Sequence, residues 1–144
     1  MSAAPVEGLR GLRTDHVSLR VPDYDAALSW YRNILGLELI REWTDPELPG
    51  LQLCTLALGG TNLEIIGNGE PAPRNPVTDI PSHMGQMGVV HLCLVVDDLE
   101  ESMSVLRERG VEELAGPVAV PALNMTLFLI KDASGNAIEI AQQD

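Results

Sequence analysis

The sequence predicts an α+β fold made of two tandem copies of a β-α-β-β-β module. Three observations lead to this prediction. The two halves of the chain repeat each other, each half alternates in the manner of strands around one stretch of helical periodicity, and a proline-bearing segment joins the halves. The 144 residues are enough for one compact domain with a real core. We place the first module at about residues 14–67, a connector at 68–87 and the second module at about 88–142, all within a single domain spanning 1–144.

The repeat appears when the sequence is shifted by 75 positions. His16 then falls on His91 and Glu64 on Glu139, so that histidine and glutamate are 48 positions apart in both halves. Neighbouring residues match as well, namely Leu19 with Leu94, Val21 with Val96 and Gly60 with Gly135. A histidine and a glutamate that recur inside the same local pattern indicate duplication of a whole structural unit.

The first half reads as a strand, a helix and three further strands. Asp23 follows Pro22 and is a plausible N-cap, the next residues carry apolar side chains at helical spacing, and Gly36 suits the end of the helix. Gly59-Gly60 predicts a hairpin turn before the last strand. The predicted strands are 15–21, 37–43, 51–58 and 62–66.

The second half repeats this order. Asp97 or Asp98 is expected to cap its helix, which Gly110 ends. The connector holds four prolines and is read as a loop without a long helix. The predicted strands are 89–96, 111–115, 125–130 and 137–141.

The duplicated histidines and glutamates are the candidate metal ligands. Because side chains alternate along a strand, His16 and Glu64 lie opposite the apolar side chains that would pack under the helix, and so do His91 and Glu139. A glutamate is costly to bury unless it is paired or binds a metal. We therefore predict that His16, Glu64, His91 and Glu139 together hold one divalent ion. Nitrogen and oxygen ligands of this kind suit Ni, Co, Mn, Zn or Fe(II).

Composition excludes several classes of partner. Nine Lys and Arg residues against 21 Asp and Glu residues give a formal charge of −12, which disfavours nucleic acid. No apolar run approaches the length needed to cross a bilayer, and residues 1–13 do not resemble a signal peptide. We expect a cytoplasmic protein that binds a small molecule and neither nucleic acid nor membrane. The two cysteines fit no disulfide framework.

Four motifs carry a resemblance to a known family, namely DHVSLRVPDYDAALSWYRNILGLEL, GGTNLEIIG, GVVHLCLVVDDLEESMSVLRERGVE and KDASGNAIEI. With these motifs the sequence resembles the vicinal oxygen chelate superfamily, which includes glyoxalase I, methylmalonyl-CoA epimerase, extradiol dioxygenases and bleomycin-resistance proteins. The resemblance covers about residues 14–142. It implies paired β-α-β-β-β modules that curl into an open, barrel-like sheet around a metal cleft, and commonly a homodimer.

The resemblance is strongest to glyoxalase I and epimerase-like members, and it implies a metal-dependent lyase or isomerase. In such an enzyme the substrate binds the metal through oxygen atoms and is stabilised as an enediolate, while Glu139 and Glu64 are the candidate catalytic groups that move a proton. An Fe(II)-dependent extradiol-type dioxygenase and a non-catalytic binding or resistance protein remain alternatives. In the dioxygenase alternative His83 could be the acid–base group, although a connector histidine is expected to be exposed.

Further residues are candidates for contacts with substrate. Arg20 shares the ligand face of the first strand and Cys93 that of its repeat. Glu47 could correspond to an epimerase acid, which the resemblance suggests for the loop after the second strand. The full set of candidates is Arg20, Trp43, Glu47, His83, Cys93 and Met125.

Overall fold

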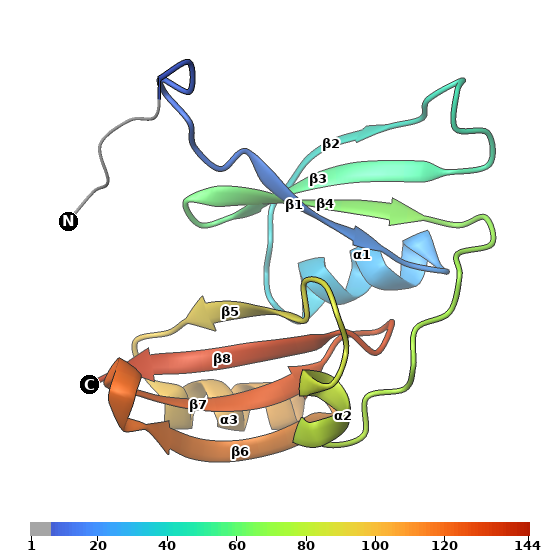
Figure 1. The fold of residues 1–144 in the computed structure, drawn as a ribbon. Coiled ribbons are helices and arrows are strands. Elements are labelled where there is room, and N and C mark those ends of the chain that lie inside the picture. The colour runs from blue at the N-terminus through green and yellow to red at the C-terminus, as the bar shows by residue number, and fades with distance from the viewer. Residues whose placement is uncertain (1–6) are drawn as a thin grey trace.

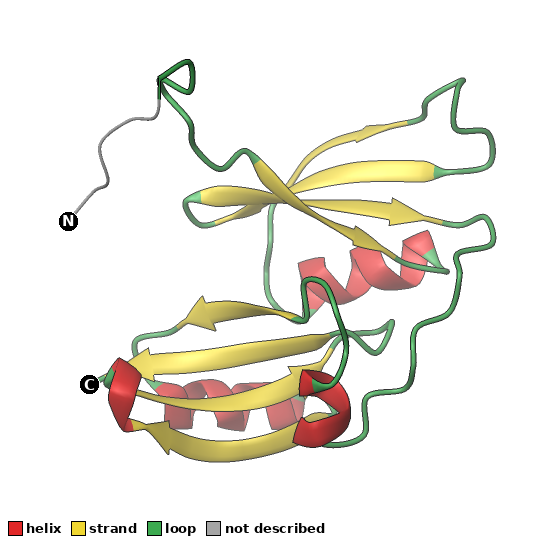
Figure 2. Ribbon diagram, viewed as in Figure 1, coloured by secondary structure: helices red, strands yellow, loops and turns green. Residues whose placement is uncertain are grey.

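Each half of the chain forms one four-stranded sheet with a ten-residue helix packed against it (Figures 1 and 2). The computed structural model describes residues 7–144. The first half contains β1 (His16–Arg20), α1 (Tyr24–Asn33), β2 (Leu39–Trp43), β3 (Gln52–Leu58) and β4 (Thr61–Gly67). The second half contains β5 (His91–Val95), α3 (Leu99–Glu108), β6 (Glu113–Val120), η1 (Pro121–Leu123), β7 (Met125–Lys131) and β8 (Ala137–Gln143).

The two sheets have the same topology. Their strand orders are β1-β4-β3-β2 and β5-β8-β7-β6, and in each sheet the first strand runs parallel to the last one while the other pairs are antiparallel. Both sheets are open. The predicted α+β class with two tandem modules is therefore confirmed.

Both long helices begin where the sequence predicts. The Asp23 side chain accepts a hydrogen bond from the Ala26 N–H at 3.0 Å, and Asp98 accepts one from the Glu101 N–H at 2.9 Å. Asp98, and not Asp97, is thus the cap of α3. Within residues 7–144 no helix is both long and apolar enough to cross a membrane.

Two segments differ from the prediction. The connector contains a short helix, α2 (Ile80–Met84), although it has no long one. The strand expected at 111–115 instead spans Glu113–Val120 as β6, and it passes through Pro117. It can do so because the pairing with β7 shifts register between Ala115 and Val118, so the ladder does not need a donor from the proline.

One core runs through both halves. Buried residues of α1, β3 and β4 pack in the same cluster as buried residues of α3, β7 and β8. Figure 1 shows α1 on the side of the first sheet that is turned toward the second half. The buried Tyr31 of α1 also donates a hydrogen bond to Asp132 of the second half at 2.6 Å. The halves are therefore joined by apolar packing and by a buried polar contact.

Close packing of β4 on α1 leads to a testable prediction. A Cβ atom added at Gly67 would lie 2.6 Å from Cα of Tyr24, a contact with backbone that cannot move away easily. We expect Gly67→Ala to lower the free energy of unfolding by about 1–3 kcal/mol, measured by urea titration. Gly60→Ala is the matched control, because nothing lies within 4 Å of a Cβ there. Equal stability of the two variants would contradict this description of the packing.

Candidate metal centre

His16 and Glu64 lie side by side on the two parallel strands β1 and β4. The pairing of Ser18 with Glu64 brings the side chains to one face, where Nε2 of His16 is 3.9 Å from Oε1 of Glu64. The Ser18 hydroxyl donates a hydrogen bond to the same oxygen at 2.7 Å and so orients the carboxylate. Leu19, which points to the opposite face, packs against the core. We call His16 and Glu64 the first pair.

The other ring nitrogen of His16 is also engaged. Nδ1 lies 2.7 Å from Oδ2 of Asp15, and this hydrogen bond is the main cause that raises the pKa of His16. In the neutral imidazole, a carboxylate that accepts the Nδ1 hydrogen leaves the Nε2 lone pair available. The available nitrogen is the one beside Glu64.

His91 and Glu139 form the second pair at the equivalent place in the other half. Nε2 of His91 is 3.2 Å from Oε2 of Glu139, and the side chains are 23% and 18% exposed. Cys93 is the strand neighbour of Glu139, as Ser18 is of Glu64. Desolvation first and the charge of Glu139 second raise the pKa of Cys93, so its thiol stays protonated.

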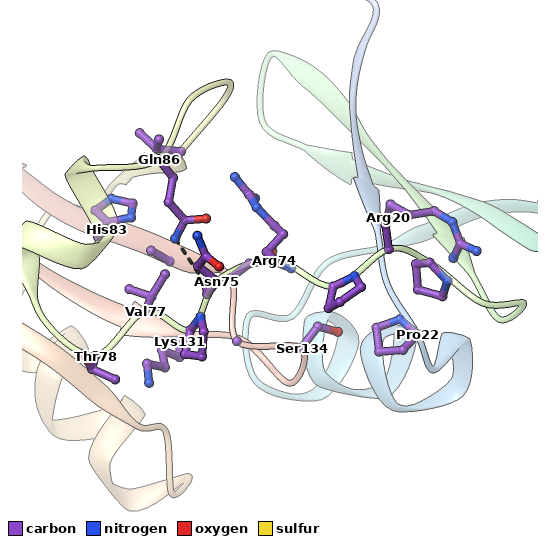
Figure 3. A pocket seen from close by; sticks show the side chains of 18 residues that line it. Arg20, Pro22, Arg74, Asn75, Val77, Thr78, His83, Gln86, Lys131 and Ser134 are labelled. Carbon is purple, nitrogen blue, oxygen red and sulfur yellow. Dashed lines mark hydrogen bonds between the residues drawn. The ribbon is translucent and has the colours of Figure 1, made fainter.

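His83 does not lie in an exposed loop, and that expectation is wrong. It is on α2, only 2% exposed, and its Nε2 is 2.9 Å from Nδ1 of His91 (Figure 3 shows His83 on this helix). Burial lowers the pKa of His83, and the neighbouring His91 adds to this effect. A sequence signal for α2 exists, because Asp79 and Ser82 form a capping box just before His83.

The structure brings each histidine to its glutamate, and it keeps the two pairs on different sheets. Within residues 7–144 of one chain, no three His, Cys, Asp or Glu side chains gather closely enough to hold one metal ion. Each pair nevertheless has donor chemistry that fits a divalent ion: an imidazole Nε2 beside a carboxylate oxygen, with the imidazole Nδ1 engaged by another group. Each pair is therefore a candidate half-site for a divalent ion.

Arg20 has a structural role at the end of the first sheet. Its guanidinium donates hydrogen bonds to the carbonyl groups of Val21, Ile66 and Asn68, at 2.7, 3.0 and 2.6 Å. These bonds occupy both terminal nitrogens and hold the ends of β1 and β4 together.

The remaining candidates for substrate contact are spread over both halves. Met125 is half-buried in a small apolar cluster with Leu127 and Leu129 of β7, and Leu129 pairs directly with Glu139 across the strands. This cluster lies next to the second pair. Trp43 ends β2 half-buried, and Glu47 is exposed in the loop that follows.

A cavity of about 460 Å³ lies beside α2, and residues of the connector and of both halves line it (Figure 3). His83 and Gln86 from the α2 region line it together with Arg20, Arg74 and Lys131. The labelled cationic side chains point in different directions in Figure 3. The cavity therefore places His83 between open space and the second pair, without forming a focused anion site.

Comparison with known proteins gives consistent results. A sequence model described as Glyoxalase/Bleomycin resistance protein/Dioxygenase superfamily matches residues 13–140. The chain is 29% identical over 140 residues to an ethylmalonyl-CoA/methylmalonyl-CoA epimerase from Cereibacter sphaeroides, covering 90% of this chain and 97% of the relative. It is 27% identical over 139 residues to a lactoylglutathione lyase from Salmonella typhimurium, covering 91% and 93%. The crystal structure of a glyoxalase family protein from Enterococcus faecalis shares the fold with a TM-score of 0.72 at 26% identity, covering 90% and 96%.

Proposed function

Because the chain belongs to the glyoxalase/bleomycin resistance protein/dioxygenase superfamily, we propose that it is a divalent-metal-dependent isomerase or lyase whose metal ligands are His16, Glu64, His91 and Glu139. One observation carries the proposal most directly. The two halves present the same donor arrangement at equivalent positions, an imidazole Nε2 within 3.9 or 3.2 Å of a carboxylate oxygen on the face opposite the helix. The epimerase and lyase relatives support the reaction class.

We further propose that the complete site forms between two copies of the chain. The pairs lie on separate sheets, so a twofold dimer is the simplest way to place the first pair of one protomer against the second pair of its partner. Such a dimer has two equivalent sites. Val95 follows His91 and Cys93 on the same strand face and is 55% exposed, which suits a surface that a second copy covers.

The residues of the chain then have distinct tasks. A bound divalent ion would polarise oxygen atoms of the substrate. Glu64, held by the Ser18 hydroxyl, and Glu139, beside His91, are the two carboxylates placed to move a proton on a carbon next to a carbonyl group. The apolar cluster that includes Met125 offers a wall for the body of the substrate.

The names of the relatives narrow the substrates to be tried. They contain coenzyme A in one case and glutathione in the other. We propose a small acyl or 2-oxoaldehyde group attached to a thiol carrier, in which the carbon beside the carbonyl bears the mobile hydrogen. The apolar cluster beside the second pair suits the acyl portion of either substrate.

Proton exchange measures this function directly, even where the product has not been identified. The zinc- or cobalt-loaded protein is expected to exchange the hydrogen beside the carbonyl of an acyl-CoA for deuterium in heavy water, or to isomerise the glutathione adduct of a 2-oxoaldehyde. Glu64→Gln and Glu139→Gln should each lower the rate by about 10²–10⁴-fold, the usual contribution of a positioned acid or base. Removal of the metal with a chelator should abolish exchange, and added metal should restore it.

Glu108→Gln is the control, because Glu108 is an exposed residue at the end of α3. Loss of exchange in Glu47→Gln, with Glu64→Gln and Glu139→Gln unaffected, would move the proton-transfer role to the exposed loop. Oxygen consumption that requires Fe(II) would favour the dioxygenase. Tight ligand binding without turnover would favour the binding protein.

A further inference from the structure

His91 has a hydrogen-bond partner that comes from outside the repeated module. His83 lies on α2, in the connector. Its Nε2 is 2.9 Å from Nδ1 of His91, the ring nitrogen that is not beside Glu139. The helix that carries it is fixed by Asp79, whose side chain accepts the Ser82 N–H at 2.8 Å while the Ser82 hydroxyl accepts the Asp79 N–H at 3.1 Å. The capping box therefore fixes the start of the helix that places His83 beside His91.

In the first half, a different residue forms the hydrogen bond with Nδ1 of the histidine. There, Nδ1 of His16 is engaged by Asp15, the residue just before it. The position equivalent to Asp15 in the repeat is Val90, whose side chain can neither donate nor accept a hydrogen bond. The second half thus lacks the local carboxylate, and the connector supplies a histidine to the same ring nitrogen.

The tautomers of the two rings set the direction of this hydrogen bond. A neutral imidazole has one N–H donor and one acceptor nitrogen, and the group bound to one nitrogen fixes the role of the other. The 2.9 Å contact between Nε2 of His83 and Nδ1 of His91 requires that one of these two nitrogens donates a hydrogen and the other accepts it. If Nε2 of His83 is the acceptor, His91 carries its hydrogen on Nδ1 and its Nε2 lone pair faces Glu139.

We propose that His83 is a positioning residue for the metal ligand His91, accepting the Nδ1 hydrogen of His91 and so keeping Nε2 of His91 in the form that binds metal. This inference rests on the proposed metal site. His83 does not touch the reacting atoms in this role, because it contacts the ring nitrogen of His91 that faces away from Glu139. It takes the place that Asp15 has in the first half.

Zinc affinity and the position of ring hydrogens test this inference in the full-length protein. His83→Leu removes the acceptor and fills the buried site with an apolar side chain. It is expected to weaken zinc binding by about 10–100-fold, as loss of a hydrogen-bond partner of a metal ligand commonly does. His83→Gln, whose side-chain oxygen can accept at the place of Nε2, should bind zinc nearly as well as the wild type. Met84→Leu is the control on the same helix, because Met84 is 62% exposed.

The ring hydrogens are read directly by ¹⁵N NMR of the zinc-loaded wild type, which needs no substitution. We expect His91 to be protonated on Nδ1 with Nε2 bound to zinc, and His83 to be protonated on Nδ1. A hydrogen on Nε2 of His83, or equal zinc affinity in the wild type and His83→Leu, would overturn the role of His83 alone. If His83→Gln loses as much zinc affinity as His83→Leu, the positioning role is also overturned, and the loss reflects altered packing around α2. A wild type that binds no zinc, or whose binding survives Glu64→Gln with Glu139→Gln, would overturn the metal site itself.

Discussion

A heterodimer of two metal-deficient variants is expected to bind about one zinc ion, whereas neither variant binds zinc tightly by itself. The first variant combines His16→Ala with Glu64→Gln, and the second combines His91→Ala with Glu139→Gln. If each site takes its first pair from one protomer and its second pair from the other, a dimer of either variant has only two of the four ligands at every site. The heterodimer has one site with no ligand substituted and one site with all four substituted.

Co-expression with two different affinity tags allows the heterodimer to be purified through both tags. Zinc is then counted by elemental analysis, with the wild-type dimer, expected to bind about two ions, as reference. The four substituted side chains are all partly exposed on strands, so the fold should tolerate the changes, and circular dichroism checks this. A heterodimer as poor in zinc as its parents would show that the site is not shared between subunits in the way proposed.

Removal of the Asp132 carboxylate is expected to destabilise the fold strongly. Asp132 is 7% exposed and accepts four hydrogen bonds, from the Tyr31 hydroxyl, the Ser134 N–H, the Asn136 N–H and the Asn136 side-chain amide, at 2.6 to 3.0 Å. Burial and the charge of Asp132 raise the pKa of Tyr31, so its hydroxyl keeps the hydrogen that it donates. Asp132→Ala leaves the buried Tyr31 hydroxyl and three part-buried N–H donors without their partner. We expect the free energy of unfolding, measured by urea titration, to fall by about 3 kcal/mol or more.

The contact between the two halves can be separated from the turn that Asp132 also holds. Tyr31→Phe removes only the hydrogen bond from α1 and should cost about 1.5–3 kcal/mol, because the acceptor is a charged buried group. Tyr24→Phe is the matched control. Its hydrogen bond to Glu42 has the same length of 2.6 Å, but Glu42 is exposed to water, so the loss should stay below about 1 kcal/mol. Equal losses for the two variants would mean that burial of Asp132 does not strengthen its contact.

The repeat in the sequence predicts the fold well because the signals it rests on are local. Asp23 and Asp98 cap helices through hydrogen bonds to residues three positions later, and Gly36 and Gly110 follow those helices with positive φ angles of 72° and 73°. Alternation along the strands also places each candidate histidine on the face of its glutamate. These features depend on neighbours along the chain or on the strand pairing within one module.

The parts that the sequence does not predict depend on contacts between distant segments. Nothing near His83 indicates that it meets His91, because the contact requires the connector to fold back over the second sheet. The separation of the two pairs likewise follows from how the two modules pack against each other, and a repeat cannot show this. The extension of β6 past Pro117 depends on a register shift with β7.

The hydrogen bond between His83 and His91 also determines how the protein could be divided into two separately expressed fragments. The repeat alone suggests a cut anywhere between residues 67 and 88. A cut just before residue 88 would match the predicted start of the second module. That cut would leave α2 on the N-terminal fragment, so the C-terminal fragment would contain His91 without His83. A split that keeps His91 supported must fall before Asp79, so that the C-terminal fragment starts with the helix cap. For reassembly from fragments, the part of the connector from Asp79 onward therefore belongs to the second half and is not a spacer between the halves.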